Sequence, residues 1–245
     1  MTAQNVNVSA PSDLAVLVKY LFYFILLLVG IYAVLAGAAH VAGSFVSYRT
    51  IDRLMQPITP RVVGIPLGPY EPQIKNLEAL KDRFFLEDGF SGAEFSIGLS
   101  GSEQINAFIT PGKQIFFTKG MLTHIHDEDI LFFILAHEIG HYKNKDAFRS
   151  GARLLLFYAV NLFLDHGVAD TTAHSAMLHY SRAAELAADC FAAQKLQAVY
   201  GSTEGGRKFF GYLAQNEPQP QWAQYINTHP GYTQRIANLS KCVAD

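Results

Sequence analysis

Residues 132–146 read FFILAHEIGHYKNKD, an apolar run that ends in two histidines, His137 and His141, with Glu138 between them. Positions four apart lie on one face of a helix, so both imidazoles can point at a single metal ion. Glu138 is rotated by about 100° from His137 and can reach a water molecule on that ion. This HExxH pattern arises by chance in about one of seventy-five chains of this composition. A metal centre therefore needs support from elsewhere in the sequence.

A third ligand is available in residues 181–192, which read SRAAELAADCFA. Glu185 and Asp189 are four apart and share one face of an otherwise mostly apolar helix. A buried carboxylate costs several kcal/mol unless it is paired or bound to a metal. We expect Glu185 to complete the ligand set and Asp189 to hydrogen-bond a ligand histidine. A surface pair with Arg182 or Lys195 is the alternative.

Zinc suits these residue types. It accepts imidazole and carboxylate ligands, and with one position open it lowers the pKa of bound water to about 7. Glu138 can take a proton from that water and deliver it to a leaving amine. We expect one Zn²⁺ per chain on His137, His141 and Glu185, with Glu138 as the general base.

The N-terminal part of the chain carries an apolar segment of a different kind. Residues 20–39 contain no charge, and twenty helical residues span about 30 Å, the thickness of the bilayer core. We predict a tail at 1–19, a transmembrane anchor at 20–42 and a linker at 43–69. A buried core helix would show a polar face. A cleaved signal peptide would have a basic start, although residues 36–38 could serve as a cleavage site.

The charges that flank the anchor bear on its orientation. Arg49, Arg53 and Arg61 follow it, while Lys19 alone stands at its front edge. By the positive-inside rule we expect a single-pass protein of a bacterial inner membrane with a cytoplasmic catalytic domain.

Composition limits the other possibilities. The formal net charge is −2 and there is no basic run, so we expect no nucleic-acid partner. The two cysteines, Cys190 and Cys242, form no CxxC motif, and we expect two free buried thiols. A disulfide formed in an oxidising compartment is the alternative.

The body of the chain predicts strands first and helices after, which favours an α+β domain at 70–245. Strands are expected at 61–65, 93–99, 104–110 and 114–119, the last two as a hairpin. Helices are expected over 72–86, from the Asp127 cap to beyond His141, and over 171–198, 203–215 and 231–243.

Four blocks of this sequence resemble one protein family. HEIGH and SRAAELAAD, with INAFITPGKQIFFTKGML at 105–122 and THPGYTQRIANL at 228–239, are similar to the gluzincins that include CAAX prenyl endopeptidases and HtpX-like membrane proteases. The resemblance implies a mainly helical zincin-like domain with a small β-sheet. It also implies zinc on the two histidines and Glu185, with Glu138 as base and Asp189 behind the ligands.

Further roles are implied by the resemblance alone. The strand containing Asn106, Ala107 and Phe108 would lie beside the cleft and bind an extended peptide through main-chain hydrogen bonds. His229 would steady the oxyanion, and Arg235 would help to close the site around the substrate. A loop histidine without a catalytic role is the alternative for His229.

One departure narrows the resemblance. Enzymes of the CAAX and HtpX type have several membrane spans, whereas the apolar stretch at 154–164 makes about 17 Å of helix, too short to cross a bilayer. We therefore expect a single-anchor branch: a membrane-anchored zinc metalloendopeptidase that cleaves polypeptides in protein quality control. A catalytically silent, membrane-tethered chaperone-like or binding module is the alternative. The sequence leaves the oligomeric state open.

Overall fold

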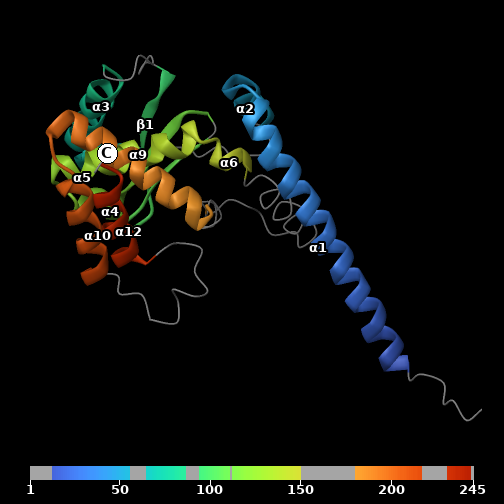
Figure 1. The fold of residues 1–245 in the computed structure, drawn as a ribbon. Coiled ribbons are helices and arrows are strands. Elements are labelled where there is room, and N and C mark those ends of the chain that lie inside the picture. The colour runs from blue at the N-terminus through green and yellow to red at the C-terminus, as the bar shows by residue number, and fades with distance from the viewer. Residues whose placement is uncertain are drawn as a thin grey trace, which may run out of the picture.

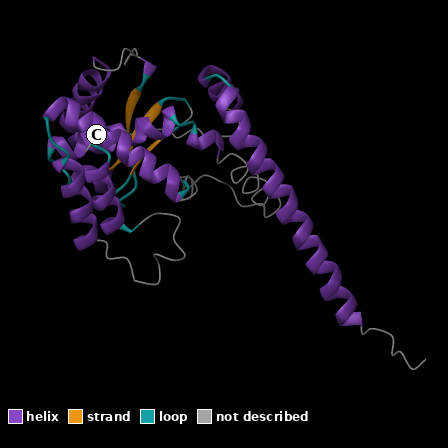
Figure 2. Cartoon of the chain, viewed as in Figure 1, coloured by secondary structure: helices purple, strands orange, loops and turns teal. Residues whose placement is uncertain are grey.

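In the computed structural model, the chain is described at residues 13–55, 65–86, 94–110, 112–149, 180–216 and 231–243. A long helix, α1 (Asp13–Phe45), projects from a domain in which helices surround a small sheet (Figure 1). Helices dominate the domain, and the strands lie among them (Figure 2). The expected α+β class, mainly helical with a small sheet, is confirmed.

The sheet has three strands, β1 (Ser96–Ser100), β2 (Ala107–Ile109) and β3 (Gln114–Thr118), in the order β1-β3-β2. β2 and β3 are antiparallel, with Phe108 opposite Phe116, which confirms the predicted hairpin. β1 runs parallel to β3 on its other side. β2 is thus an edge strand of this sheet. The helix α3 (Glu71–Leu86) contacts β1, and the helix α5 (Glu128–Lys143) contacts β2.

Helix α5 (Glu128–Lys143) lies at the centre of the domain. Its cap is Asp127, whose carboxylate accepts a hydrogen bond of 3.0 Å from the Asp129 N–H. A cap of this kind satisfies an amide that has no partner inside the helix. Buried residues occupy all faces of α5, which contacts α3, α9, α10 and β2. Helices that are apolar all round belong in a core, so the HExxH motif lies inside the domain.

Three helices complete the domain: α9 (Arg182–Tyr200), α10 (Glu204–Asn216) and α12 (Tyr232–Lys241). Helix α9 begins after Ser181, whose backbone is extended, so the expected start at residue 171 is wrong. It ends at Gly201, which has a left-handed φ of 68°, close to the expected end at residue 198. Shorter helices are η1 (Gly68–Tyr70), α4 (Lys119–His124) and α6 (Asp146–Arg149). The expected strand at 61–65 and the apolar stretch at 154–164 fall outside the described residues, apart from Ile65.

Glycines set the closeness of the central helices. A Cβ on Gly140 would lie 3.3 Å from Ala188 Cα and 3.1 Å from the Phe191 ring, so α5 and α9 approach each other tightly at this point. Glycine in a helix interior costs about 1 kcal/mol relative to alanine. Gly140 therefore lowers the stability of α5 itself but allows close contact between the two helices that carry the candidate ligands.

The expectation of two free thiols is wrong. Cys190 on α9 and Cys242 at the end of α12 form a disulfide, with Cα atoms 5.2 Å apart. The partners are separated by 52 positions in the sequence. Their proximity follows from the packing of α12 on α9, which residue spacing does not reveal.

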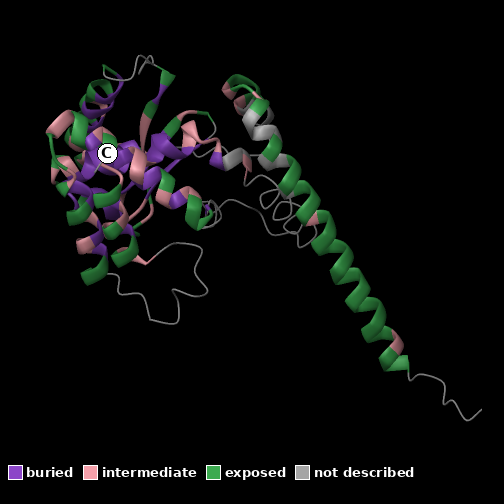
Figure 3. Ribbon diagram, in the orientation of Figure 1, coloured by how far each residue is buried: buried purple, intermediate pink, exposed green. Residues whose placement is uncertain are grey.

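Helix α1 is unlike the rest of the molecule. Its described side chains are mostly exposed, whereas purple marks the buried centre of the domain (Figure 3). Residues Asp13–Leu35 form a span with mean hydropathy 2.5, none of it buried within the chain. Such exposure disagrees with the core-helix alternative. The helix is also longer than the predicted anchor at 20–42.

The segment after α1 is fastened to the C-terminal end of α5. At the start of α2 (Tyr48–Met55), the Tyr48 ring stacks on Tyr142 with centroids 5.4 Å apart, and its hydroxyl donates to the Lys143 carbonyl at 2.7 Å. Tyr142 donates to Asp52 at 2.9 Å, and Lys145 Nζ donates to the Val46 carbonyl at 2.7 Å. We call these contacts the α2–α5 clamp. Through them, the exposed helix is bound directly beside the HExxH motif.

A pair of glycines on α10 tests the packing of the core. A Cβ on Gly205 would overlap the Asp129 carbonyl group of α5, whereas one on Gly211 would meet nothing within 4 Å. We expect Gly205→Ala to lower the free energy of unfolding by about 1–3 kcal/mol. Gly211→Ala should raise it by up to about 1 kcal/mol. Chemical unfolding of the detergent-solubilised chain measures both, and equal shifts for the two variants would contradict the packing described here.

Candidate metal centre and active site

The two histidines of α5 point their outer ring nitrogens at a common position. His137 Nε2 and His141 Nε2 lie 3.0 Å apart, and the rings are perpendicular. Both side chains are largely inaccessible, at 12% and 3% exposure. Two buried nitrogens at this separation and spacing are arranged to share one ion.

Helix α9 brings a carboxylate to the same point. Glu185 Oε1 lies 3.5 Å from His141 Nε2, and Glu185 Oε2 lies 3.8 Å from His137 Nε2. A tetrahedral zinc ion with ligand bonds near 2.1 Å separates its donor atoms by about 3.4 Å. In the described part of the chain, these three residues form the group of His, Cys, Asp or Glu side chains that could hold a metal. Their chemistry and separations fit zinc.

The inner ring nitrogens face carboxylates. Asp189 Oδ1 lies 3.0 Å from His137 Nδ1, and Asp146 Oδ2 lies 2.9 Å from His141 Nδ1. Asp189 is fully buried and Asp146 nearly so. Carboxylates behind metal-binding imidazoles fix the tautomer and the ring orientation and make the metal-facing nitrogen more basic. Each ligand histidine thus has a carboxylate at its inner nitrogen; the contact of His141 is a hydrogen bond, whereas that of His137 is an ion-pair distance without hydrogen-bond alignment.

The protonation of His141 reflects this arrangement. When protons are the only cations at the site, burial disfavours the charged imidazole, but the Asp146 and Glu185 carboxylates outweigh burial and raise the pKa of His141 to about 9. A metal ligand must be the neutral imidazole, so a divalent cation displaces this proton. Metal binding is therefore expected to strengthen as the pH rises towards 9.

Glu138 lies beside the ligands and is 8% exposed. Burial raises the pKa of its carboxyl, an effect that His137 and His141 oppose. The Ile109 backbone, on the edge strand β2, also favours the ionised form. Glu138 therefore interacts with both the candidate ligands and the strand on which a substrate is expected. An acid–base residue beside the candidate ligands can take part in proton transfer.

The chain matches the family model described as Peptidase family M48 over residues 73–243. The chain belongs to this family. The M48 match runs from the first turn of α3 to the end of α12 and confirms the resemblance to HtpX-like and CAAX proteases. Membership implies a metal-dependent peptidase. No curated protein gives a significant match to the chain.

Within this M48 domain, Arg235 of α12 lies behind the metal site. Its guanidinium donates two hydrogen bonds to Asp189, from Nε at 2.8 Å and from Nη2 at 2.7 Å, and Nη2 lies 3.2 Å from Glu185 Oε2. Burial raises the pKa of Asp189, but Arg235 and His137 outweigh burial and hold it below its usual value. These contacts make Arg235 a positioning residue for the carboxylates of Asp189 and Glu185. The substrate contact expected of it stays a prediction.

Sequence reasoning missed two residues of the M48 site. Asp146 follows His141 by five positions, and the chain returns to α5 because Lys145 adopts a left-handed φ of 57°. The only signal was an acidic residue at the end of the HExxH segment. Tyr180 packs its ring 4.0 Å from the His141 ring and is buried. Its sole signal was an aromatic residue directly before the Ser181 helix cap.

The remaining predicted site residues lie at the edge of the sheet or outside the described residues. Ala107 and Phe108 are buried in β2, and Asn106 precedes this strand, its carbonyl accepting a hydrogen bond of 3.1 Å from the Thr118 N–H. Their contact with substrate stays a prediction. His229 lies outside the described residues.

Asp146 offers a test of the site. Asp146→Ala removes the acceptor for His141 Nδ1, so we expect the Kd for zinc to rise roughly 10- to 100-fold. Asp146→Asn keeps an acceptor oxygen, so its zinc affinity should fall less than that of Asp146→Ala. Competition with a chromophoric chelator measures both, with Asp82→Ala, at an exposed side chain of α3, as the control. Unchanged zinc affinity in Asp146→Ala would show that the carboxylate does not support the ligand.

Proposed function

We propose that the chain is a membrane-anchored zinc metalloendopeptidase that hydrolyses peptide bonds in polypeptides near a bilayer. The observation that carries the proposal is the convergence of two imidazoles and one carboxylate, with the general base Glu138 beside them. Zinc identity, with one ion per chain, is supported by the ligand types and by the donor separations.

Each residue has a definable task in such a reaction. When bound, zinc would supply a Lewis acid and lower the pKa of a water molecule at its open position. The Glu138 carboxylate takes the proton of the attacking water and returns it to the leaving amine. The carboxylates of Asp146 and Asp189 hold the imidazoles in place. The edge strand β2 can pair with an extended peptide, which would align the scissile bond beside Glu138.

The alternative, a silent binding or chaperone-like module, is less well supported. A structural zinc site is closed by four protein ligands, whereas this site brings three together among the described residues. A structural site also has no use for a buried carboxylate next to the ligands. The buried position of Glu138 next to the three candidate ligands favours turnover.

Membrane anchoring is supported by α1, which is apolar and exposed. Residues 20–42 are proposed to cross the bilayer once, and the α2–α5 clamp would then hold the peptidase domain next to the membrane. Unfolded or damaged segments of neighbouring proteins are fitting substrates because an edge strand recognises main chain more than side chains. This is the basis for a role in protein quality control.

Glu138→Gln tests the mechanism. The amide keeps the size of the side chain but cannot accept the proton of water, so we expect cleavage of an unfolded protein to fall at least about 100-fold. Zinc content should stay near that of the wild type because Glu138 is not a ligand. Loss of zinc would place Glu138 in the ligand set, and unchanged cleavage would exclude it as the base.

The anchor makes a second prediction. We expect the full chain to stay with membranes after alkaline extraction and to keep residues 20–42 in the mature protein, as seen by mass spectrometry. The Glu138→Gln variant is the matched control, because it separates processing by another enzyme from cleavage of the chain by itself. A mature chain that begins after residue 38 in both proteins would instead identify the segment as a signal peptide.

A further inference from the structure

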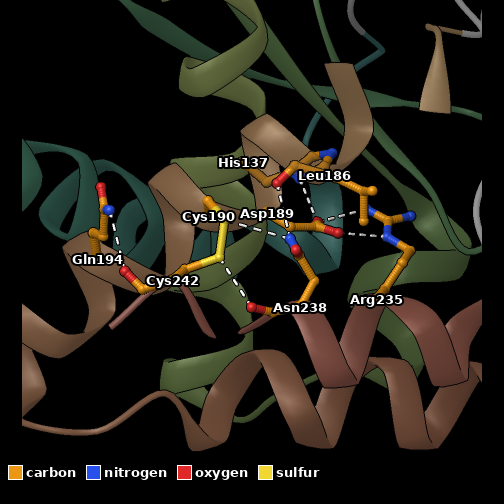
Figure 4. The surroundings of a disulfide bond; sticks show 8 residues. All are labelled: His137, Leu186, Asp189, Cys190, Gln194, Arg235, Asn238 and Cys242. Atoms are coloured by element: carbon orange, nitrogen blue, oxygen red, sulfur yellow. Dashed lines mark hydrogen bonds and ion pairs between the residues drawn. A yellow bond between two sulfur atoms is a disulfide. The ribbon is translucent and has the colours of Figure 1, made fainter. Parts of the chain in front are cut away.

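A covalent bond ties the last helix of the domain to the helix that supplies Glu185. Cys190 directly follows Asp189 on α9, and Cys242 is the C-cap of α12 (Figure 4). The chain has two cysteines, and both are used in this bond. The disulfide therefore begins one residue away from the carboxylate that supports His137.

One face of α12 carries the residues that contact α9. Arg235, Asn238 and Cys242 are spaced by three and four positions and so share a side of the helix. Arg235 holds Asp189 and Glu185, while Asn238 Nδ2 donates to the Leu186 carbonyl at 3.1 Å. Figure 4 shows these side chains directed at α9 from one helix.

The contacts extend past the disulfide. Gln194 Nε2 of α9 donates to the Cys242 carbonyl at 3.2 Å, which satisfies one of the free carbonyls at the end of α12. A helix of ten residues such as α12 has little stability by itself. Its position, and with it the position of Arg235, depends on these ties to α9.

We infer that the Cys190–Cys242 disulfide locks Arg235 against the metal-site carboxylates. Because such a bond forms and persists in oxidising compartments, the peptidase domain matures and works on the oxidising side of its membrane. The bond forms when the two thiols lose two protons and two electrons to a protein disulfide oxidant, whose own disulfide becomes a dithiol. Such oxidants act outside the reducing cytosol. The metal part of the inference rests on the proposed zinc centre and the membrane on the proposed anchor, whereas the oxidising compartment rests on the disulfide alone.

This assignment opposes the direction favoured by the flanking charges. Arg49 and Arg53 after the anchor favoured a cytoplasmic domain. Long domains, however, cross membranes largely regardless of their charge, and the rule applies chiefly to short loops. A disulfide joining two core helices is the stronger indicator, because cytosolic thiol systems keep such pairs reduced.

The state of the thiols in cells tests the location. Cells that express the full chain are quenched in acid, and free thiols are tagged with a maleimide that adds a visible mass. We expect no tag before reduction and two tags after it, with Cys242→Ser accepting one tag without reduction as the control. Two tags on the unreduced wild type would overturn the inference. This result does not depend on peptidase activity, so it separates failure of the inference from failure of the proposed function.

A fusion of alkaline phosphatase after Asp245 reads the same location independently, because this reporter folds only where disulfides form. We expect an active reporter. An inactive reporter on a chain that is inserted in the membrane would place the domain in the cytosol and overturn the inference.

Zinc affinity tests the lock. Reduction of the purified full chain with a phosphine is expected to raise the zinc Kd about tenfold, as loss of an outer support does. The double variant Cys190→Ser, Cys242→Ser should already show the weaker binding and not respond to the phosphine. An unchanged Kd in the reduced wild type would overturn the lock.

The role of Arg235 is tested by combining reduction of the disulfide with the Arg235→Lys substitution. Arg235→Lys keeps a positive charge but loses the two-pronged contact with Asp189. If the disulfide acts through Arg235, reduction and Arg235→Lys together should weaken zinc binding little more than either alone. Fully additive losses would show that the disulfide acts elsewhere.

Discussion

The contact between α5 and α9 is the interaction on which the site depends. It places a carboxylate from one helix within 3.8 Å of the imidazole nitrogens of the other. Gly140 makes this distance attainable, since a side chain there would press on Ala188 and Phe191. The ligand set is therefore a property of helix packing, and the metal would in turn hold the two helices together.

Around this contact, the charges are organised in layers. The two imidazoles are backed by Asp146 and Asp189, while Arg235 lies behind both Asp189 and the metal-facing Glu185. A buried carboxylate without a partner would be costly. Hydrogen bonds and ion pairs between these layers offset part of the cost of placing acidic residues in a core that is otherwise apolar. Preorganised supports of this kind keep imidazoles oriented before the metal arrives.

Local signals in the sequence predicted the elements well. Asp127 marked the start of α5, and the β-type segments at 104–110 and 114–119 marked the two strands of the hairpin. The ligand candidates could be chosen because helical spacing fixes which residues share a face. These features depend on neighbours a few positions apart in the chain.

The features that the sequence did not predict depend on tertiary packing. Asp146 reaches His141 only because Lys145 takes a left-handed conformation, which few lysines adopt. The disulfide depends on how α12 lies on α9, and residue spacing carries no information on that docking.

The α2–α5 clamp has a geometric consequence. Tyr142 and Lys143, which Tyr48 grips, come immediately after the ligand His141. If α1 crosses a lipid bilayer, as proposed, the active site would lie at a nearly constant distance from the lipid headgroups. A flexible linker would not fix this distance. Bonds within that short reach would be open to attack, and a folded ectodomain standing farther out would be spared until it collapses towards the surface.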